Sequence, residues 1–170
     1  MPCEPMTAKQ LPVEQKVFTE CWQLLRLLAH KDADRDEAEC RKSHILQYGT
    51  GSPVYSISST LCDAIFSWAE KSDGAVIADG GSADTSKETD VLLRCWELIK
   101  TYAGISVSDD EAWDDLLRDS EVLYYLYAGT RTNILASAAC FSVVNYCEAR
   151  SLLSAGADPG EIDERNDADE

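Results

Sequence analysis

The sequence contains few basic residues. It has 15 Lys and Arg residues against 31 Asp and Glu residues, which gives a formal net charge of −16 over 170 residues. Binding to the phosphate backbone of DNA or RNA requires clustered Lys and Arg side chains, and the sequence has no such cluster. Direct binding to nucleic acid is therefore disfavoured.

Long apolar runs are also missing. The longest nearly apolar stretch covers residues 134–144 and includes two serines. A stretch of this length is typical of a buried helix, because a helix that crosses a membrane needs about 20 consecutive, mostly apolar residues. The sequence therefore predicts no membrane segment.

No pair of cysteines has the Cys-x-x-Cys spacing. The seven cysteines are odd in number and widely spaced, and residues 1–10 lack the apolar core of a signal peptide. Most of the cysteines lie among apolar residues, where a thiol behaves as a small hydrophobic group. We therefore expect reduced cysteines in the core of a cytoplasmic protein, without a structural zinc site.

Motifs for catalysis or for metal and cofactor binding are not found. The histidines, His30 and His44, lack the spacing to a second metal ligand. Residues 32–36 resemble the start of a calcium-binding loop, but the positions that require Gly and a bidentate acid hold Glu37 and Ser43. The sequence thus predicts no catalytic residue, no metal and no cofactor. It leaves open whether the chain is an enzyme.

The apolar residues that are present recur with the period of a helix. They predict six helices, over residues 13–29, 36–48, 53–68, 85–103, 108–127 (with a break near residue 120) and 132–155. The expected N-terminal caps are Ser52, Thr132 and two capping boxes, Thr85 with Glu88 and Ser108 with Glu111. No strand pattern of comparable length competes, so the predicted fold class is all-α.

The first and fourth predicted helices resemble each other in sequence. Four residues recur at a constant offset of 74, namely Val17, Cys21, Trp22 and Leu24 as Val91, Cys95, Trp96 and Leu98. The match extends to Glu14 with Glu88 and to Ala29 with Ala103. These identities indicate an internal duplication of a three-helix unit.

The chain is therefore expected to form one helical domain over residues 13–156. Its two repeat units cover residues 13–71 and 87–156, joined by a loop at 72–86, and pack as one bundle with pseudo-two-fold symmetry. Residues 1–12 are an N-terminal extension. Residues 157–170 carry seven acids against one base and a single large apolar residue, so this tail is predicted to be disordered.

A second acidic segment is the candidate site. Residues 108–130 carry seven acids against the single base Arg118, a net charge of −6. Helix physics accounts for the acids of the first turn, which complement the helix dipole, but not for those further along. The predicted partner-binding residues are Asp109, Asp110, Glu111, Asp114, Asp115, Asp119 and Glu121.

We expect a non-enzymatic interaction protein that docks on a basic protein surface. Charge alone suggests an inhibitor or a nucleic-acid mimic, such as a phage anti-defence protein, whose target would itself bind nucleic acid. One alternative is a small-ligand binder or an enzyme with its site inside the helical bundle. Another is a structural adaptor that oligomerises through an exposed surface around Trp22 and Trp96, and a homo-oligomer is left open.

Overall fold

The computed structural model describes residues 3–30, 32–71 and 83–156. These ranges contain one short 3-10 helix, six α-helices and no strand. The elements are η1 (Ala8–Gln10), α1 (Pro12–Leu28), α2 (Arg35–Gln47), α3 (Val54–Glu70), α4 (Ser86–Tyr102), α5 (Asp110–Tyr125) and α6 (Thr132–Ser154). The prediction of an all-α fold with six helices is confirmed. The predicted tail at 157–170 and most of the predicted loop at 72–86 lie outside the described residues.

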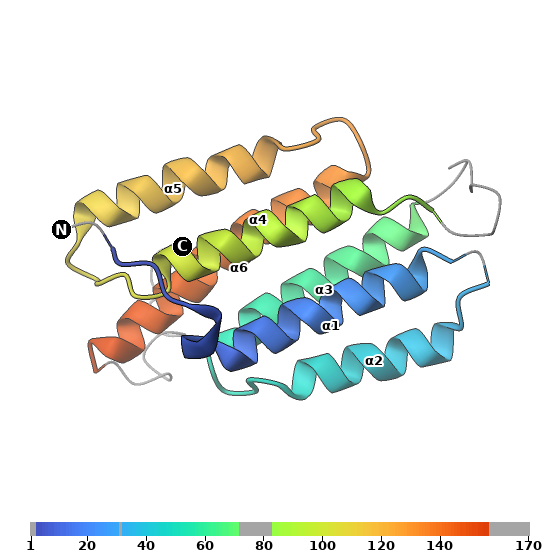
Figure 1. Cartoon of the computed structure of the whole chain (residues 1–170), viewed down its shortest axis with the longest axis horizontal. Coiled ribbons are helices and arrows are strands. Elements are labelled where there is room, and N and C mark those ends of the chain that lie inside the picture. Colours follow the sequence, from blue (N-terminus) through green and yellow to red (C-terminus); the bar gives the residue numbers. More distant parts are fainter. Residues whose placement is uncertain (1–2, 31, 72–82, 157–170) are drawn as a thin grey trace, which may run out of the picture.

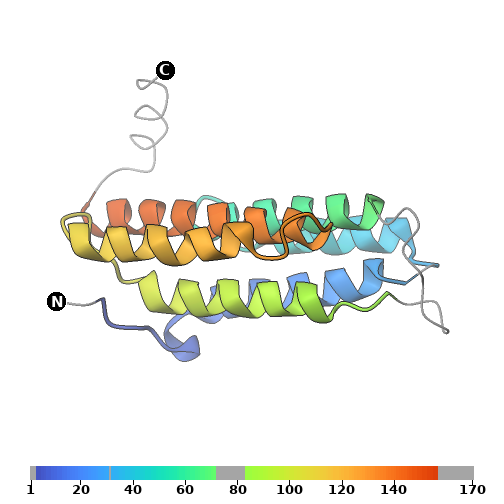
Figure 2. The same ribbon diagram turned by 90° about the horizontal axis from the view of Figure 1, so that it is seen from above.

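The helices form a bundle of two layers. One layer contains α5, α6, α3 and α2 in that order, and α1 and α4 lie on it side by side (Figures 1 and 2). Within the first layer, α6 packs against α3 and α5. Between the layers, α1 packs on α3 and α2, and α4 packs on α6 and α5. Figure 1 shows that α1 and α4 run in opposite directions.

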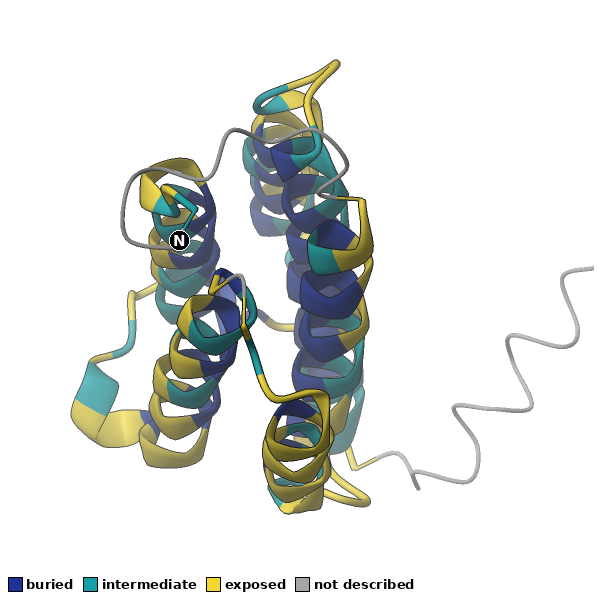
Figure 3. Ribbon diagram, turned by 90° about the vertical axis from the view of Figure 1, so that its right-hand side faces the viewer, coloured by how far each residue is buried: buried dark blue, intermediate teal, exposed yellow. Residues whose placement is uncertain are grey.

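The core lies between these two layers. Figure 3 shows the buried residues gathered where the layers face each other. Leu24, Cys21 and Cys95 of the α1–α4 layer are completely buried, and Trp68 and Tyr146 of the other layer have almost no exposure. The helix α6 is central, because it contacts α3, α4 and α5. No helix of the described residues has the length and apolar character needed to cross a membrane.

Three of the predicted N-terminal caps are wrong. Ser52 donates its hydroxyl to the backbone oxygen of Gly49 and does not cap α3. Thr132 lies inside the first turn of α6 and donates to a buried carboxylate. Asp109, the residue after Ser108, caps α5 by accepting the backbone N–H of Ala112 at 3.1 Å. Small polar side chains can cap a helix or bond elsewhere, so tertiary contacts decide which they do.

The predicted capping box of α4 is also wrong. Thr85 precedes the helix but makes no side-chain cap bond, and Asp84 accepts the backbone N–H of Ser86 instead. Glu88 turns its carboxylate into the core, where it is 4% exposed. The fourth helix therefore begins where the sequence indicates, but a different residue satisfies its first amide.

Candidate functional site

The acidic segment forms the outer side of α5. Asp109 caps the helix, and Asp110 and Glu111 occupy its first turn, where their charges complement the helix dipole. The helix continues without a break through Ser120, whose hydroxyl donates to the backbone oxygen of Leu117 at 3.1 Å. All seven predicted acids thus lie on one continuous helix or at its cap.

Three of the seven acids have partners within the protein. Asp109 is the cap, Asp115 accepts a hydrogen bond from Arg118 at 2.6 Å, and Asp119 accepts one from the hydroxyl of Tyr102. Burial and the hydrogen bond to Asp119 both raise the pKa of Tyr102. These three carboxylates have structural roles that the sequence does not reveal.

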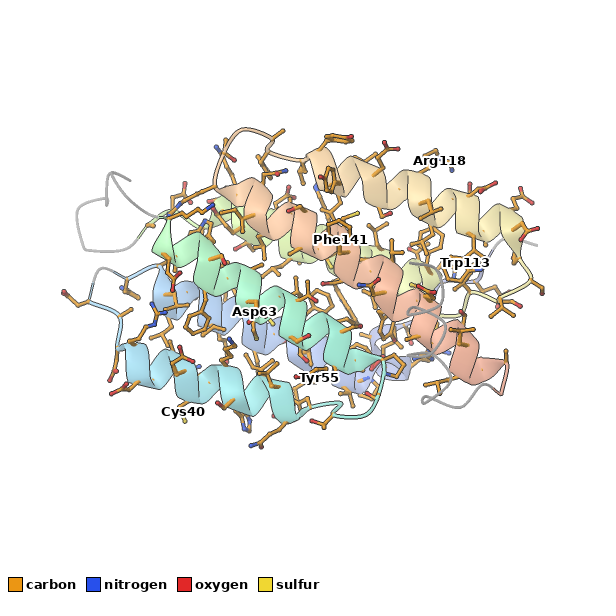
Figure 4. All side chains as sticks on the ribbon, turned by 180° about the vertical axis from the view of Figure 1, so that it is seen from behind. Cys40, Tyr55, Asp63, Trp113, Arg118 and Phe141 are labelled. Carbon is orange, nitrogen blue, oxygen red and sulfur yellow. The ribbon has the colours of Figure 1, made fainter. Side chains whose placement is uncertain are left out.

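The other four acids are exposed and have no recorded ion pair or side-chain hydrogen bond among the described residues. They are Asp110, Glu111, Asp114 and Glu121. Arg118, the only basic residue of the segment, lies on the same helix (Figure 4) and is already paired with Asp115. The outer side of α5 therefore presents uncompensated negative charge at positions fixed by the helix.

Exposed apolar side chains accompany these acids. Leu117 is 52% exposed, although its neighbour Leu116 is completely buried. Tyr124 makes edge contacts with Tyr125 at 5.0 Å and with Phe141 of α6 at 6.0 Å, measured between ring centroids. Phe141 is 55% exposed and projects from the outer side of α6 (Figure 4). Sequence reasoning missed this aromatic cluster because it joins two helices.

Two glutamates lie inside the bundle. Glu88 accepts hydrogen bonds from the indole N–H of Trp68 and the hydroxyl of Thr132, both at 2.8 Å, while its Oε2 atom has no partner. Glu14, 5% exposed, accepts a hydrogen bond from the hydroxyl of Tyr146 at 2.8 Å. Burial and this carboxylate raise the pKa of Tyr146. Glu88 thus joins α4 to α3 and α6, and Glu14 joins α1 to α6.

A surface groove runs between α1 and α4. It has a volume of about 460 Å³ and is open on the side away from the core. Four residues of α1 and four of α4 line it, and each residue of α1 has its counterpart on α4 at the offset of 74. These pairs are Gln15 with Thr89, Phe18 with Leu92, Thr19 with Leu93, and Trp22 with Trp96. We call this feature the α1/α4 groove.

The histidines do not form a metal site in the described residues. His44 lies 2.9 Å from the hydroxyl of Tyr48, and its Nε2 is 3.7 Å from Glu20. No group of three or more His, Cys, Asp or Glu side chains in the described ranges is arranged to hold a metal ion. All seven cysteines carry free thiols.

No protein family model matches the chain, and neither a curated protein sequence nor a solved structure matches it.

Proposed function

We propose that this protein is a non-enzymatic interaction protein whose α5 face docks on a basic protein surface. The observation that carries the proposal is the set of four exposed, unpartnered carboxylates on α5. A helix holds them at fixed spacing, so they can match Lys and Arg side chains at fixed positions on a partner. The proposed partner is a protein, with neither direct nucleic-acid binding nor membrane binding.

The aromatic cluster beside these acids supports the same proposal. Tyrosine and phenylalanine are enriched in the cores of protein interfaces, where a few large side chains contribute most of the binding free energy. Tyr124, Tyr125 and Phe141 are exposed, and the two tyrosines follow Glu121 within about one turn of α5, whereas Asp110, Glu111 and Asp114 lie toward the other end of the helix. In this proposal the carboxylates orient the partner and accelerate association, while the aromatic rings provide the apolar contact.

The finer proposal is an inhibitor that imitates the charge of a nucleic acid and occupies the binding cleft of a nucleic-acid-binding protein. A phage anti-defence protein would be one example. Its support is the charge of α5 alone. A cytoplasmic location belongs to the same proposal and is supported by the seven free thiols, because reduced cysteines are typical of a reducing compartment.

The experiment compares two variants with the same change in net charge. In the first, Glu111→Gln, Asp114→Asn and Glu121→Gln remove three unpartnered charges from α5. In the second, three exposed acids of α2 are removed by Asp36→Asn, Glu37→Gln and Glu39→Gln. Partners are captured from the native host at low and high salt, and association rates with the captured partner are then measured across a salt series.

Only the α5 variant should associate more slowly and show a weaker dependence on salt, because it removes a local array of charge. Equal slowing by both variants would mean that net charge alone matters. Wild-type rates for both would show that the acids only make the protein soluble. Either result would refute docking through α5.

We further propose that the bundle arose by internal duplication and has pseudo-two-fold symmetry. Support comes from positions that lie far apart in the chain. Glu14 and Glu88 are both buried and both accept a hydrogen bond from a buried aromatic side chain. The α1/α4 groove is lined by four residue pairs at the offset of 74. In an experimental structure, superposing residues 13–71 on 87–151 should place Trp22 on Trp96. Trp22 and Trp96 on unrelated helices would refute the duplication.

A further inference from the structure

The helix α2 buries fewer side chains than any other α-helix of the bundle. Its two buried residues are Ala38 and Ile45. At the other edge of the layer α5 buries four side chains, and each of the remaining α-helices buries at least six. Figure 1 shows α2 at the edge of the bundle, beside α1. Because the packing of an apolar face provides most of the stability of a helix in a protein, α2 is the helix that the core holds least.

Exposed ion pairs connect α2 to α3. Arg35 pairs with Glu70 at 2.8 Å, and Lys42 pairs with Asp63 at 2.9 Å. All of these side chains except Lys42 are more than half exposed. An exposed ion pair contributes little to stability and is weakened by salt. The attachment of α2 to α3 therefore depends on ionic strength.

The same two cations cover an aromatic ring of α3. The guanidinium of Arg35 and the ammonium of Lys42 each lie 5.1 Å from the centroid of the Phe66 ring, and Phe66 is 6% exposed. Cys62, one turn earlier on the same side of α3, is completely buried and lies close enough to Lys42 to interact with it electrostatically. Charged side chains of α2 thus shield part of an apolar face of α3.

The packing between α2 and α1 is incomplete. The hydroxyl of Tyr48, the residue after α2, donates to Glu20 at 3.3 Å, and Nε2 of His44 lies 3.7 Å from the same carboxylate. Both distances are long for a hydrogen bond. A pocket of about 50 Å³ also lies between the two helices, beside Ile45. These contacts add little to the attachment of α2.

Segments without helix flank α2 on both sides. Residues 48–53 join it to α3 and include Gly49 and Gly51, which both have positive φ. Glycine adopts either sign of φ at little cost, so this connection can change its course more easily than a helix can. Residues 32–34 on the other side are not helical either. The helix α2 can therefore move relative to α1 and α3 without breaking another helix.

We propose that α2 is a lid, which opens as a unit from α1 and α3 while the other five α-helices remain packed, and which uncovers Phe66 and the thiol of Cys62. Salt favours the open state, because it screens the ion pairs with α3. The five remaining helices keep the core, since α2 contributes only Ala38 and Ile45 to it. Proteins commonly open at their least buried element without unfolding the rest. Access to this face of α3 is thus controlled by α2.

Hydrogen exchange of the full native chain tests whether α2 opens as a unit. The amides of α2 should share one opening and exchange at least about 100-fold faster than the core amides of α3 and α6. Added salt should speed the exchange of α2. Salt should slow the exchange of the core, which requires unfolding of the whole chain, because it screens the repulsion within a chain of net charge −16. Amides of α2 that exchange at the rate of the core would overturn the proposal.

Two variants with the same change in charge test what holds the lid closed. Lys42→Gln removes the ion pair with Asp63 and the contact with Phe66, and should speed the exchange of α2 by about three- to tenfold. Arg41→Gln is the matched control, because the ion pair of Arg41 with Glu37 lies within α2. It should change that exchange by less than about twofold. Equal acceleration by both variants would show that the contacts with α3 do not hold the lid, and would contradict the proposal.

Thiol modification tests what the lid uncovers. The variant Cys40→Ser removes the exposed thiol of α2 itself. In this variant iodoacetamide should modify Cys62 before Cys95 and Cys147, which are buried on α4 and α6. Adding Lys42→Gln should raise the rate at Cys62 by the same factor as the hydrogen exchange of α2. If Cys62 reacts only together with Cys95 and Cys147, α2 does not uncover this face of α3 and the lid is refuted.

Discussion

Replacing the buried Glu88 by leucine is predicted to destabilise the fold, although leucine is apolar and similar in volume. The Glu88 carboxylate accepts hydrogen bonds from the indole of Trp68 and the hydroxyl of Thr132, each at 2.8 Å. Trp68 is 1% exposed and Thr132 is 3% exposed. Neither donor can therefore turn to water when the carboxylate is removed.

The magnitude follows from these two donors. A buried donor left without an acceptor costs about 1–3 kcal/mol. The indole N–H of Trp68 is fixed by its ring, so it cannot turn toward another acceptor. Removing the carboxylate also relieves the cost of burying Oε2, which has no partner. We therefore expect Glu88→Leu to lower the free energy of unfolding by about 2–4 kcal/mol.

Urea denaturation followed by circular dichroism measures this loss. Glu88→Gln keeps one acceptor oxygen and should cost less than Glu88→Leu. Glu148→Leu, an exposed change on α6, should stay within about 0.5 kcal/mol of the wild type. A double variant combines Glu88→Leu with Trp68→Phe, which removes the indole donor. Its loss of stability should be smaller than the sum of the losses of the two single variants. Strict additivity, or a Glu88→Leu protein as stable as the wild type, would refute the reasoning.

Three further predictions concern pH, backbone geometry and thiols. Burial raises the pKa of Cys147 to about 12 and also raises the pKa of Cys95, and the pKa of Cys21 is raised as well, so these thiols must ionise on unfolding at high pH; the stability should be constant below pH 9 and then fall toward pH 12 by about 1.4 kcal/mol per pH unit for each of the three thiols, measured by urea denaturation. Gly49→Ala should cost more than Gly51→Ala in thermal melts, because both glycines have positive φ but only at position 49 would a new Cβ meet Val54, at 2.7 Å. In the native protein a thiol reagent should modify the exposed Cys40 fastest, and equal rates at the buried cysteines would contradict the core positions.

The sequence by itself determined the fold class and the approximate helix boundaries. Helix formation depends on contacts within about one turn, so a stripe such as Val17, Cys21 and Leu24 is visible as a spacing of three or four residues. The structure begins and ends α1 and α2 within one residue of the prediction. It extends α3 beyond Trp68, and α5 passes through Ser120, where the sequence predicts a break, because a buried serine can bond its own helix backbone.

The candidate site was only partly visible in the sequence. The acidic segment stood out because charge can be counted along the chain. The sequence could not show which carboxylates have a hydrogen-bond partner, because Asp119 accepts a hydrogen bond from Tyr102 on a different helix. It also could not show that Leu117 faces solvent, because this depends on how α5 lies on α6. The aromatic cluster of Tyr124 and Phe141 likewise exists only once α5 and α6 are adjacent.

The tertiary structure alone decided the role of Glu88 and the existence of the α1/α4 groove. A glutamate three residues after a threonine is typical of a capping box, but here burial between α3, α4 and α6 offered it two donors that no local pattern contains. The offset of 74 paired Trp22 with Trp96 without indicating that the helices carrying them lie antiparallel with their aromatic stripes on one open surface. Local spacing sets which residues share a helix face, whereas the packing of residues far apart in the chain sets what each face meets.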